Sequence, residues 1–271
     1  DNPDDLALEG RHQVQTLMFS DVAGFVGISG QLDAEQTVAL LNEYLGEMTA
    51  EITKADGILD KYLGDGIMAF FGPPFTPGNH ALAACRAALK MDQRLAQLRD
   101  VWCEQGLPPI NARIGLATGE VIVGNIGSEQ TRDYTCIGET VNLASRLEGV
   151  NKYYKTSIII DAGTRDLLGK NVAVRELDII KVLGSDDPVR IFEVQALADD
   201  QTALQKDLAE KFASALVEYR AGRFIEAEAV FKELVSAPYD DAVSSIFLKR
   251  CMMYDMSAPK KWDGVFVMDK K

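Results

Sequence analysis

Two stretches with the hydrophobic period of an α-helix enclose a pair of short apolar runs, and this order constrains the fold more than any other feature. The first stretch has apolar residues at steps of three and four, at Val38, Leu41, Leu45, Met48 and Ile52. The second covers residues 80–102 with similar spacing. Between them, residues 58–62 and 67–71 flank a Leu-Gly-Asp-Gly segment whose glycines supply the positive φ of a tight hairpin. The order helix, hairpin, helix predicts helices packed on a sheet.

Further runs extend this alternation. Residues 14–19 form a mostly apolar run that suits a buried strand and ends on Ser20 and Asp21. After the second helix we expect strands at 110–117 and 121–124, joined by a turn at Thr118 and Gly119. We then expect, in order, a strand at 134–137, a helix at 139–150, a strand at 156–160, a short helix at 162–168 and a hairpin of 172–183 with 189–194. The alternation predicts an α/β (α+β) layer fold with a mixed sheet.

Composition changes after Ala196, and we expect three parts: a lead-in over 1–11, a main domain over 12–196 and an all-helical extension over 197–271. The extension has helical apolar stripes over 204–219 and 224–234, and a third helix from Pro238 through Phe247. It resembles one helix-turn-helix unit of a tetratricopeptide-like repeat with a capping helix. Because such a unit cannot bury its faces alone, we expect it to pack on the main domain or on a partner.

The charge balance is strongly acidic. With 41 acidic against 28 basic side chains, the formal net charge is -13, which argues against broad binding to nucleic acid or anionic membranes. No apolar run approaches the roughly 18 residues of a membrane span. The chain begins at Asp1 rather than Met, so we expect a piece of a longer protein, in which a sensor or membrane anchor could precede these residues.

The four cysteines are widely scattered and have only two histidines to join them. This pattern argues against a zinc cluster or a disulfide framework and favours the reduced thiols of a cytoplasmic domain. Cys85 and Cys251 fall in apolar helical patterns, so we expect both to be buried hydrophobic residues.

Two aspartates stand at positions that suit a metal site. Asp21 follows an apolar strand, and Asp65 lies in the glycine-flanked hairpin. Taken alone, Asp21 is more often a cap or turn residue, and Asp65 is as often simple turn chemistry. Two strands of one sheet can, however, present both carboxylates to divalent ions, and Mg²⁺ typically takes one or two carboxylates plus substrate phosphates.

A third candidate is the pair Asn142 and Arg146. Four residues apart, they project from the same face of a predicted helix. Such a pair can hold a ribose and stabilise charge on a phosphorus atom during transfer. The alternative is a solvated polar face, which is the commoner meaning of an isolated pair at this spacing.

Together these residues resemble the catalytic domain of the class III nucleotidyl cyclases, the adenylyl and guanylyl cyclases. The resemblance rests on four segments in the family's order and spacing: 19–25 (FSDVAGF), 61–71 (KYLGDGIMAFF), 113–127 (RIGLATGEVIVGNIG) and 133–147 (DYTCIGETVNLASRL). It covers about residues 12–196. It implies a ferredoxin-like βαββαβ core with a mixed, mainly antiparallel sheet, acting as a homodimer with active sites shared at the interface. Trp262-Asp263-Gly264 also resembles the ending of bacterial cyclases with short helical extensions.

The resemblance implies a role for each matching residue. The metal ligands would be Asp21, Asp65 and the carbonyl of Val22, holding two Mg²⁺ or Mn²⁺ ions per site. The triphosphate would contact Arg113 and the backbone of Val22, Ala23, Gly24 and Phe25. The partner subunit would supply Lys61 and Thr135 to read the purine, and Asn142 and Arg146 to position the ribose and stabilise the transition state.

The two base-reading positions favour ATP. Lys61 can donate to adenine N1, and Thr135 can accept from the N6 amino group. Guanylyl cyclases of this family instead have Glu and Cys at these positions. We therefore expect an adenylate cyclase, a phosphorus–oxygen lyase that makes cyclic AMP for signalling. The alternatives are a guanylyl cyclase, or a catalytically weak nucleotide-sensing or scaffold domain.

Two positions depart from the family pattern. Ala23 stands where many members have Arg, and Leu183-Gly184-Ser185 stands where the family has Lys-Gly-Lys. The second motif often supplies a lysine to the triphosphate. Lys181 or Lys155 is the expected substitute, and lower affinity for ATP is the alternative.

Overall fold

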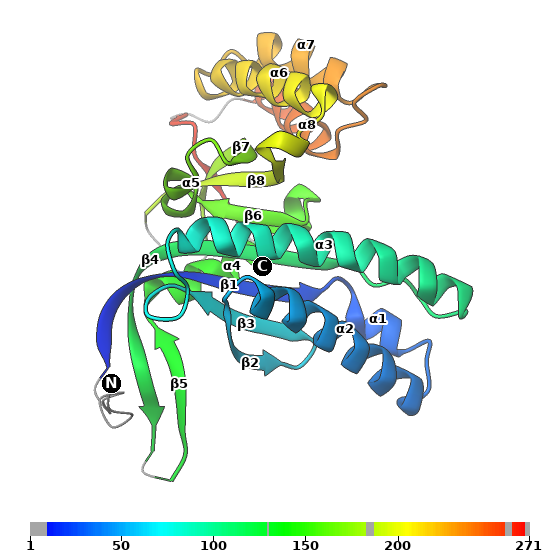
Figure 1. Cartoon of the computed structure of the whole chain (residues 1–271). Coiled ribbons are helices and arrows are strands. Elements are labelled where there is room, and N and C mark those ends of the chain that lie inside the picture. Colours follow the sequence, from blue (N-terminus) through cyan, green and yellow to red (C-terminus); the bar gives the residue numbers. More distant parts are fainter. Residues whose placement is uncertain (1–9, 129, 183–186, 258–261, 269–271) are drawn as a thin grey trace.

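The computed structural model describes residues 10–128, 130–182, 187–257 and 262–268. In this part of the chain nine strands form one mixed sheet, with helices on both faces (Figure 1). The first half contains β1 (Arg11–Val22), α1 (Phe25–Ser29), α2 (Ala34–Lys54), β2 (Ile58–Leu63), β3 (Gly66–Phe71), α3 (His80–Glu104) and β4 (Ala112–Gly127). The second half contains β5 (Arg132–Ile137), α4 (Glu139–Tyr154), β6 (Ile158–Asp161), α5 (Ala162–Leu168), β7 (Val172–Lys181) and β8 (Val189–Leu197). The extension contains α6 (Ala203–Arg220), α7 (Phe224–Leu234), α8 (Ala242–Met256) and β9 (Phe266–Val267).

The strand order confirms the predicted ferredoxin-like core. Along the sheet the strands run β2-β3-β1-β4-β6-β8-β7-β9, and β5 pairs with β4. The first four strands of this order, β2, β3, β1 and β4, pair antiparallel with one another. With α2 and α3 they follow along the chain in the order βαββαβ. The parallel pairs β4–β6 and β7–β9 make the sheet mixed.

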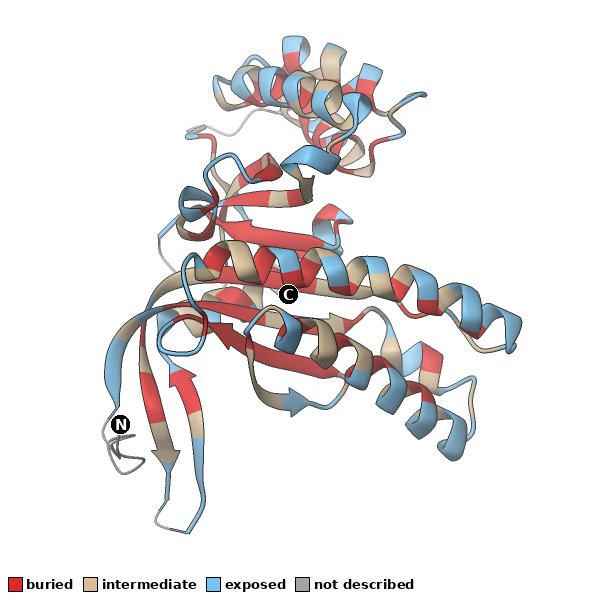
Figure 2. Ribbon diagram, viewed as in Figure 1, coloured by how far each residue is buried: buried red, intermediate tan, exposed pale blue. Residues whose placement is uncertain are grey.

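Helices α2 and α3 cover one face of the sheet. Helix α2 begins with a capping box, in which the Asp33 carboxylate accepts from the Gln36 amide and the Gln36 side chain accepts from the Asp33 amide. The apolar stripes of both helices pack on the sheet, where Met48, Ile52 and Trp102 are fully buried. Figure 2 shows buried residues on the central strands and on the inner faces of the helices, with exposed residues on the outer faces of the helices and toward the ends of β4 and β5. Helix α4 packs on the opposite face with the extension.

Two expectations about element boundaries are wrong. Residues 118–119 form no turn, because β4 runs continuously through them and pairs with β1 as far as Val123 opposite Arg11. Gly119 serves a close approach within the strand: a Cβ atom there would lie 2.6 Å from Thr140 Oγ1. The third helix of the extension begins at Ala242 rather than Pro238, because the Asp241 carboxylate caps it by accepting from the Ser244 amide.

Three ion pairs attach the extension to β7. Arg175 Nη1 lies 2.9 Å from the Asp241 carboxylate, and Glu176 lies 2.7 Å from Arg220 Nη2. Asp178 Oδ2 lies 2.6 Å from Arg250 Nη1, and both of these side chains are buried. Strand β9 adds a parallel edge to β7. Of the two packing alternatives, the structure therefore has the extension packed on the main domain. The division at residue 196 stays a prediction.

All four cysteines are free thiols, and Cys85 and Cys251 are fully buried, as predicted. Burial raises the pKa of Cys251 to about 12. Within the described ranges, no helix has the length and apolar character needed to span a membrane.

Candidate active site

Asp21 lies at the end of β1, one residue before the strand ends. Its partner in the antiparallel ladder is Arg113 of β4, and Arg113 Nη2 donates to Asp21 Oδ2 at 3.0 Å. The alternative that Asp21 is a helix cap does not apply, because Gly24 occupies the N-cap position of α1. Asp21 is therefore a side chain held at the sheet edge by a basic partner.

Asp65 lies in the β2–β3 turn, beside Gly64 with its φ of 70°. The turn packs closely against the end of β1: a Cβ atom on Gly66 would lie 3.0 Å from the Ser20 carbonyl oxygen and 3.6 Å from Asp21 Oδ1. Burial and the neighbouring charge of Asp21 raise the pKa of Asp65, while backbone amides of Asp65 and Val22 hydrogen-bond to its carboxylate. The structure thus brings the two predicted carboxylates together.

Glu148 of α4 completes this charged group, although the sequence did not single it out. Its Oε1 lies 2.9 Å from Arg113 Nε, so one guanidinium contacts both Glu148 and Asp21. Burial raises the pKa of Glu148 to about 7, and Arg113 opposes that shift. The available signal was a carboxylate beside Ala144 and Leu147, two apolar residues on the buried side of α4.

The acidic pair fits a small divalent cation. Two carboxylates in contact repel one another, and Asp65 is partly removed from water, so a cation between them would relieve both costs. Within the described residues no cluster of three or more carboxylate, histidine or cysteine side chains suits a metal ion. A site with only two carboxylates still suits a hard cation such as Mg²⁺, because this ion is commonly held by one or two carboxylates together with water and substrate oxygens.

The predicted phosphate-binding segment is the turn between β1 and α1. Val22 is buried, and Gly24 has a φ of 75°. The Ala23 amide donates to the Asn111 carbonyl at 2.7 Å, and the Val22 amide is directed to Asp65. Two of the four amides of this segment are thus engaged within the protein, which leaves Gly24 and Phe25 as the candidates for a phosphate contact.

Lys61 of β2 and Thr135 of β5 meet through a buried carboxylate, Asp60. Thr135 Oγ1 donates to Asp60 Oδ2, and Lys61 Nζ lies 3.3 Å from Asp60 Oδ1. Lys61 Nζ also lies 3.2 Å from Asp133 Oδ2. Although partial burial acts to lower it, the contacts with Asp133 and Asp60 leave the pKa of Lys61 raised. The Asp60 side chain is 0% exposed, and that of Lys61 is 36% exposed.

A β-bulge explains why adjacent residues of β2 join one cluster. Side chains of neighbouring strand residues normally point to opposite faces. The β2–β3 register shifts between Leu59 and Lys61, which leaves Asp60 as the extra residue. Asp60 therefore shares a cluster with Lys61, an arrangement that residue alternation does not predict.

Asn142 and Arg146 both lie on α4, and Asn142 is exposed. At about 100° per residue they are separated by about 40° around the helix, whereas Glu148 lies about 200° from Arg146. Since Glu148 faces Arg113, the side of α4 that carries Asn142 and Arg146 faces away from the acidic pair of the same chain.

The family's lysine motif cannot be followed here, because residues 183–186 lie outside the described ranges. The two substitutes are described: Lys181 ends β7, and Lys155 is the C-cap of α4 with a φ of 58°. The role of either residue stays a prediction.

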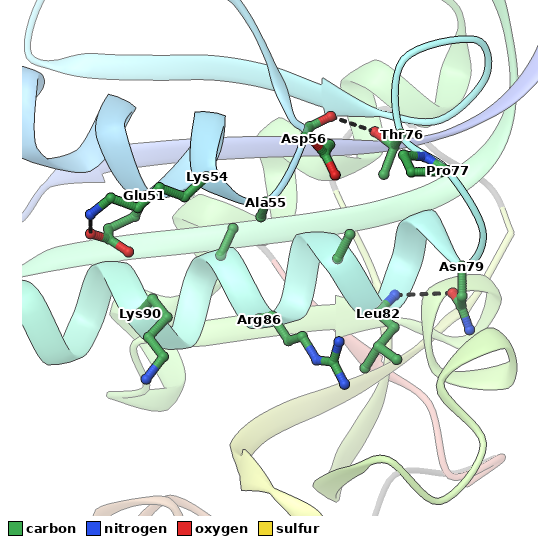
Figure 3. A pocket seen from close by; sticks show the side chains of 12 residues that line it. Glu51, Lys54, Ala55, Asp56, Thr76, Pro77, Asn79, Leu82, Arg86 and Lys90 are labelled. Carbon is green, nitrogen blue, oxygen red and sulfur yellow. Dashed lines mark hydrogen bonds and ion pairs between the residues drawn. The ribbon is translucent and has the colours of Figure 1, made fainter.

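A surface pocket of about 540 Å³ lies elsewhere, between the end of α2 and the start of α3 (Figure 3). It contains none of the predicted site residues. Lys54 is paired with Glu51 at 2.6 Å, and Figure 3 shows Arg86 and Lys90 extending from α3 away from α2. The basic groups of this pocket do not converge on a single point.

The fold and the site define a class: a ferredoxin-like α+β domain with an acidic pair and an arginine at one edge of its sheet. The chain belongs to the adenylate and guanylate cyclase catalytic domain family, whose model matches residues 8–195. The resemblance found in the sequence is thereby confirmed.

Relatives of known name agree with this family. Over 182 residues the chain is 35% identical to adenylate cyclase 1 of Rhizobium meliloti (strain 1021), covering 67% of this chain and 27% of that protein. The crystal structure of the adenylyl cyclase CyaB from P. aeruginosa is 38% identical, with a TM-score of 0.66 over 72% of this chain and 100% of that one. A guanylyl cyclase structure is 34% identical, with a TM-score of 0.64 over 72% of this chain and 98% of that one. The chain thus spans about a quarter of the length of the Rhizobium relative.

Proposed function

We propose that this chain is the catalytic part of an adenylyl cyclase, which converts ATP into 3′,5′-cyclic AMP and pyrophosphate. The single observation that carries the proposal is the Lys61–Asp60–Thr135 cluster. The cluster joins two side chains from different strands. The Lys61 ammonium is the donor that adenine N1 requires, and the Thr135 hydroxyl is the acceptor that the N6 amino group requires. The names of the bacterial relatives support the same substrate.

Asp21 and Asp65 are proposed to hold two Mg²⁺ or Mn²⁺ ions, with the carbonyl of Val22 assisting. When bound, such ions lower the pKa of the 3′-hydroxyl and neutralise charge on the triphosphate. Arg113 already contacts the Asp21 carboxylate, so its guanidinium lies next to the position proposed for the phosphates. The amides of Gly24 and Phe25 contribute donors beside it.

Arg146 is proposed to neutralise the charge that develops on the α-phosphate, and Asn142 to orient the ribose. The reaction is intramolecular, because the 3′-hydroxyl and the α-phosphorus belong to one molecule. Holding the ribose and the phosphate in line is therefore a large part of the catalysis. An arginine at the transferring phosphorus contributes about 10³-fold or more in related phosphoryl transfers.

A homodimer with shared active sites is proposed as well, and the direction of α4 supports it. Within one chain, Arg146 and Glu148 lie on opposite sides of the helix, and only Glu148 faces the acidic pair. A second copy can bring its own Asn142 and Arg146, together with Lys61 and Thr135, to that pair. The proposed assembly therefore contains two equivalent sites, each built from both chains.

A guanylyl cyclase is the second candidate, and the similarity to a guanylyl cyclase structure favours keeping it. Lys61 and Thr135 argue against it, because guanine presents O6 as an acceptor and N1–H as a donor. A weak nucleotide-sensing or scaffold domain is the third candidate, suggested by the absence of the family's Lys-Gly-Lys.

One assay separates the three candidates. Purified protein is incubated with ATP or GTP and with Mg²⁺ or Mn²⁺, and cyclic nucleotide is measured. We expect cyclic AMP from ATP, little product from GTP, and loss of activity on chelation. Asp21→Ala and Asp65→Ala serve as controls, and activity that survives in both would refute the proposed metal site. A protein that forms neither product would favour the sensing or scaffold function.

A further inference from the structure

Asp60 places a buried carboxylate between the two side chains proposed to read the purine. We propose that Asp60 is a specificity-determining residue, which fixes the direction of the Thr135 hydroxyl so that it can only accept a hydrogen bond from the base. The inference rests on the proposed adenine contacts of Lys61 and Thr135. It adds that a third residue decides whether the threonine donates or accepts its hydrogen bond to the base.

A threonine hydroxyl alone discriminates poorly between adenine and guanine. It has one proton and two lone pairs, so it can rotate to donate to guanine O6 or to accept from the adenine N6 amino group. The lysine of the pair is restricted to donating, but the threonine is not. A purine-reading threonine therefore needs a neighbour that commits its proton.

Asp60 is such a neighbour. An ionised carboxylate only accepts, and Thr135 Oγ1 donates to Asp60 Oδ2. With its proton committed, the hydroxyl keeps only lone pairs for a ligand. An amino group at position 6 of the purine can donate to them, whereas a carbonyl oxygen there would face a second acceptor. Thr135 is buried, so water does not readily relieve such a mismatch.

The other Asp60 oxygen acts on the lysine. Asp60 Oδ1 lies 3.3 Å and Asp133 Oδ2 lies 3.2 Å from Lys61 Nζ. The ammonium has three donors, of which one donates to Asp133 Oδ2, while Asp60 Oδ1 holds the ammonium in place as an ion pair. A donor that stays available suits the unprotonated N1 of adenine and opposes the N1–H of guanine. One buried carboxylate thus contacts both base-reading side chains: it sets the direction of the hydroxyl and helps to position the ammonium, and the bulge in β2 puts it there.

The decisive variant is Asp60→Asn, which keeps the shape but adds an amide donor. The Asn amide can donate to Thr135, which frees the hydroxyl proton for guanine O6. We expect the ratio of kcat/KM for ATP to kcat/KM for GTP to fall about tenfold or more. The reason is that adenine loses one hydrogen bond in the variant and guanine gains one. Asp133→Asn is the matched control: its side chain is 63% exposed and also contacts Lys61, but no contact to Thr135 is expected from it. We expect this control to weaken ATP use while leaving the ratio of the two kcat/KM values close to that of the wild type.

A merely structural role gives a different result. If Asp60→Asn lowers kcat/KM for both nucleotides by the same factor and leaves their ratio unchanged, the proposal is wrong. Should Asp60→Asn fail to fold, Asp60→Ser is the second variant, because it is smaller, neutral and unable to hold the Thr135 proton as a charged acceptor does. The ratio is expected to fall there too, and an unchanged ratio again overturns the proposal.

The test also distinguishes this inference from the proposed function. If the wild-type protein forms no cyclic nucleotide, the proposed function fails, and the dissociation constants of ATP and GTP are compared by calorimetry instead. A preference for ATP that Asp60→Asn removes would still support the role of Asp60. Equal binding of ATP and GTP by the wild type would overturn it.

Discussion

Arg113 lies directly opposite Asp21 in the β1–β4 ladder, and its guanidinium donates to the Asp21 carboxylate at 3.0 Å. The same guanidinium reaches Glu148 at 2.9 Å. Without bound metal, Arg113 is therefore the positive charge that balances Asp21. A divalent cation between Asp21 and Asp65 would take over this function and release Arg113 toward the substrate.

This exchange predicts how the metal changes stability. In Arg113→Gln the carboxylates of Asp21 and Glu148 lose their basic partner, and Asp65 stays beside the unbalanced Asp21, so the metal-free variant should melt below the wild type. Added Mn²⁺ should raise the Tm of the variant more than that of the wild type, because a ligand that binds only the folded state stabilises it and here displaces no arginine. For a chain of this size about 1 kcal/mol corresponds to a Tm shift of a few degrees. An equal or smaller shift in the variant would contradict the exchange.

The raised pKa of Glu148 predicts a dependence of stability on pH. Its pKa is about 7 in the folded protein, above its ordinary value near 4.5. The folded state therefore binds more protons than the unfolded state between these values, so this group makes the free energy of unfolding fall as pH rises from about 4.5 to about 7. The contribution is at most about 3 kcal/mol. In metal-free urea titrations across this range, Glu148→Gln should show a shallower fall than the wild type; parallel pH profiles would exclude Glu148 as the source.

The buried pair Arg250–Asp178 predicts that the extension is needed for stability. Arg250 also donates to the hydroxyl groups of Tyr153 and Tyr154 at the end of α4. Arg250→Met leaves the Asp178 carboxylate buried with less compensation, and should lower the free energy of unfolding by about 3–5 kcal/mol in urea titrations. The exposed neighbouring variant Lys249→Met should cost less than about 0.5 kcal/mol. Similar losses in the two variants would argue against the role of the ion pair, and Arg250→Met with Asp178→Asn should recover part of the loss.

The two base-reading positions predict a change of substrate. Lys61→Glu with Thr135→Cys should shift the preference from ATP toward GTP, measured as the ratio of the two kcat/KM values. The new Glu would stand beside buried Asp60, and two carboxylates there repel one another. Adding Asp60→Asn to the double variant should therefore increase GTP use further. Continued ATP use by the double variant, without GTP turnover, would contradict the assignment of these positions.

Much of the fold could be predicted from local patterns. The period of three and four gave the position of α2, and the glycines around Asp65 indicated the β2–β3 turn, because both features depend on neighbouring residues alone. The turn expected at Thr118 and Gly119 was wrong because this glycine accommodates Thr140, which is distant in sequence. A residue that serves tertiary packing looks the same in sequence as one that serves a turn.

Part of the candidate site could also be predicted from local sequence patterns. Asp21, Asp65, Lys61 and Thr135 stand in recognisable motifs, whereas Asp60 and Glu148 gain their positions from a β-bulge and from the rotation of α4. Neither effect leaves a clear local pattern. Asp21 lies opposite Arg113 because of the register between two strands about 90 residues apart in sequence. That register is determined by packing and not by local sequence.

The central claim is that ATP is cyclised at metal-dependent sites, each formed by two copies of the chain. Its most direct test mixes Asp65→Ala, which lacks a metal ligand, with Arg146→Ala, which lacks the transition-state arginine, and measures cyclic AMP formed from ATP and Mn²⁺. Each variant alone should be inactive. In an equimolar mixture half of the dimers are mixed and have one intact site each, so about a quarter of the wild-type activity should return. A mixture that stays inactive, although both variants are folded and exchange subunits, would contradict the shared site.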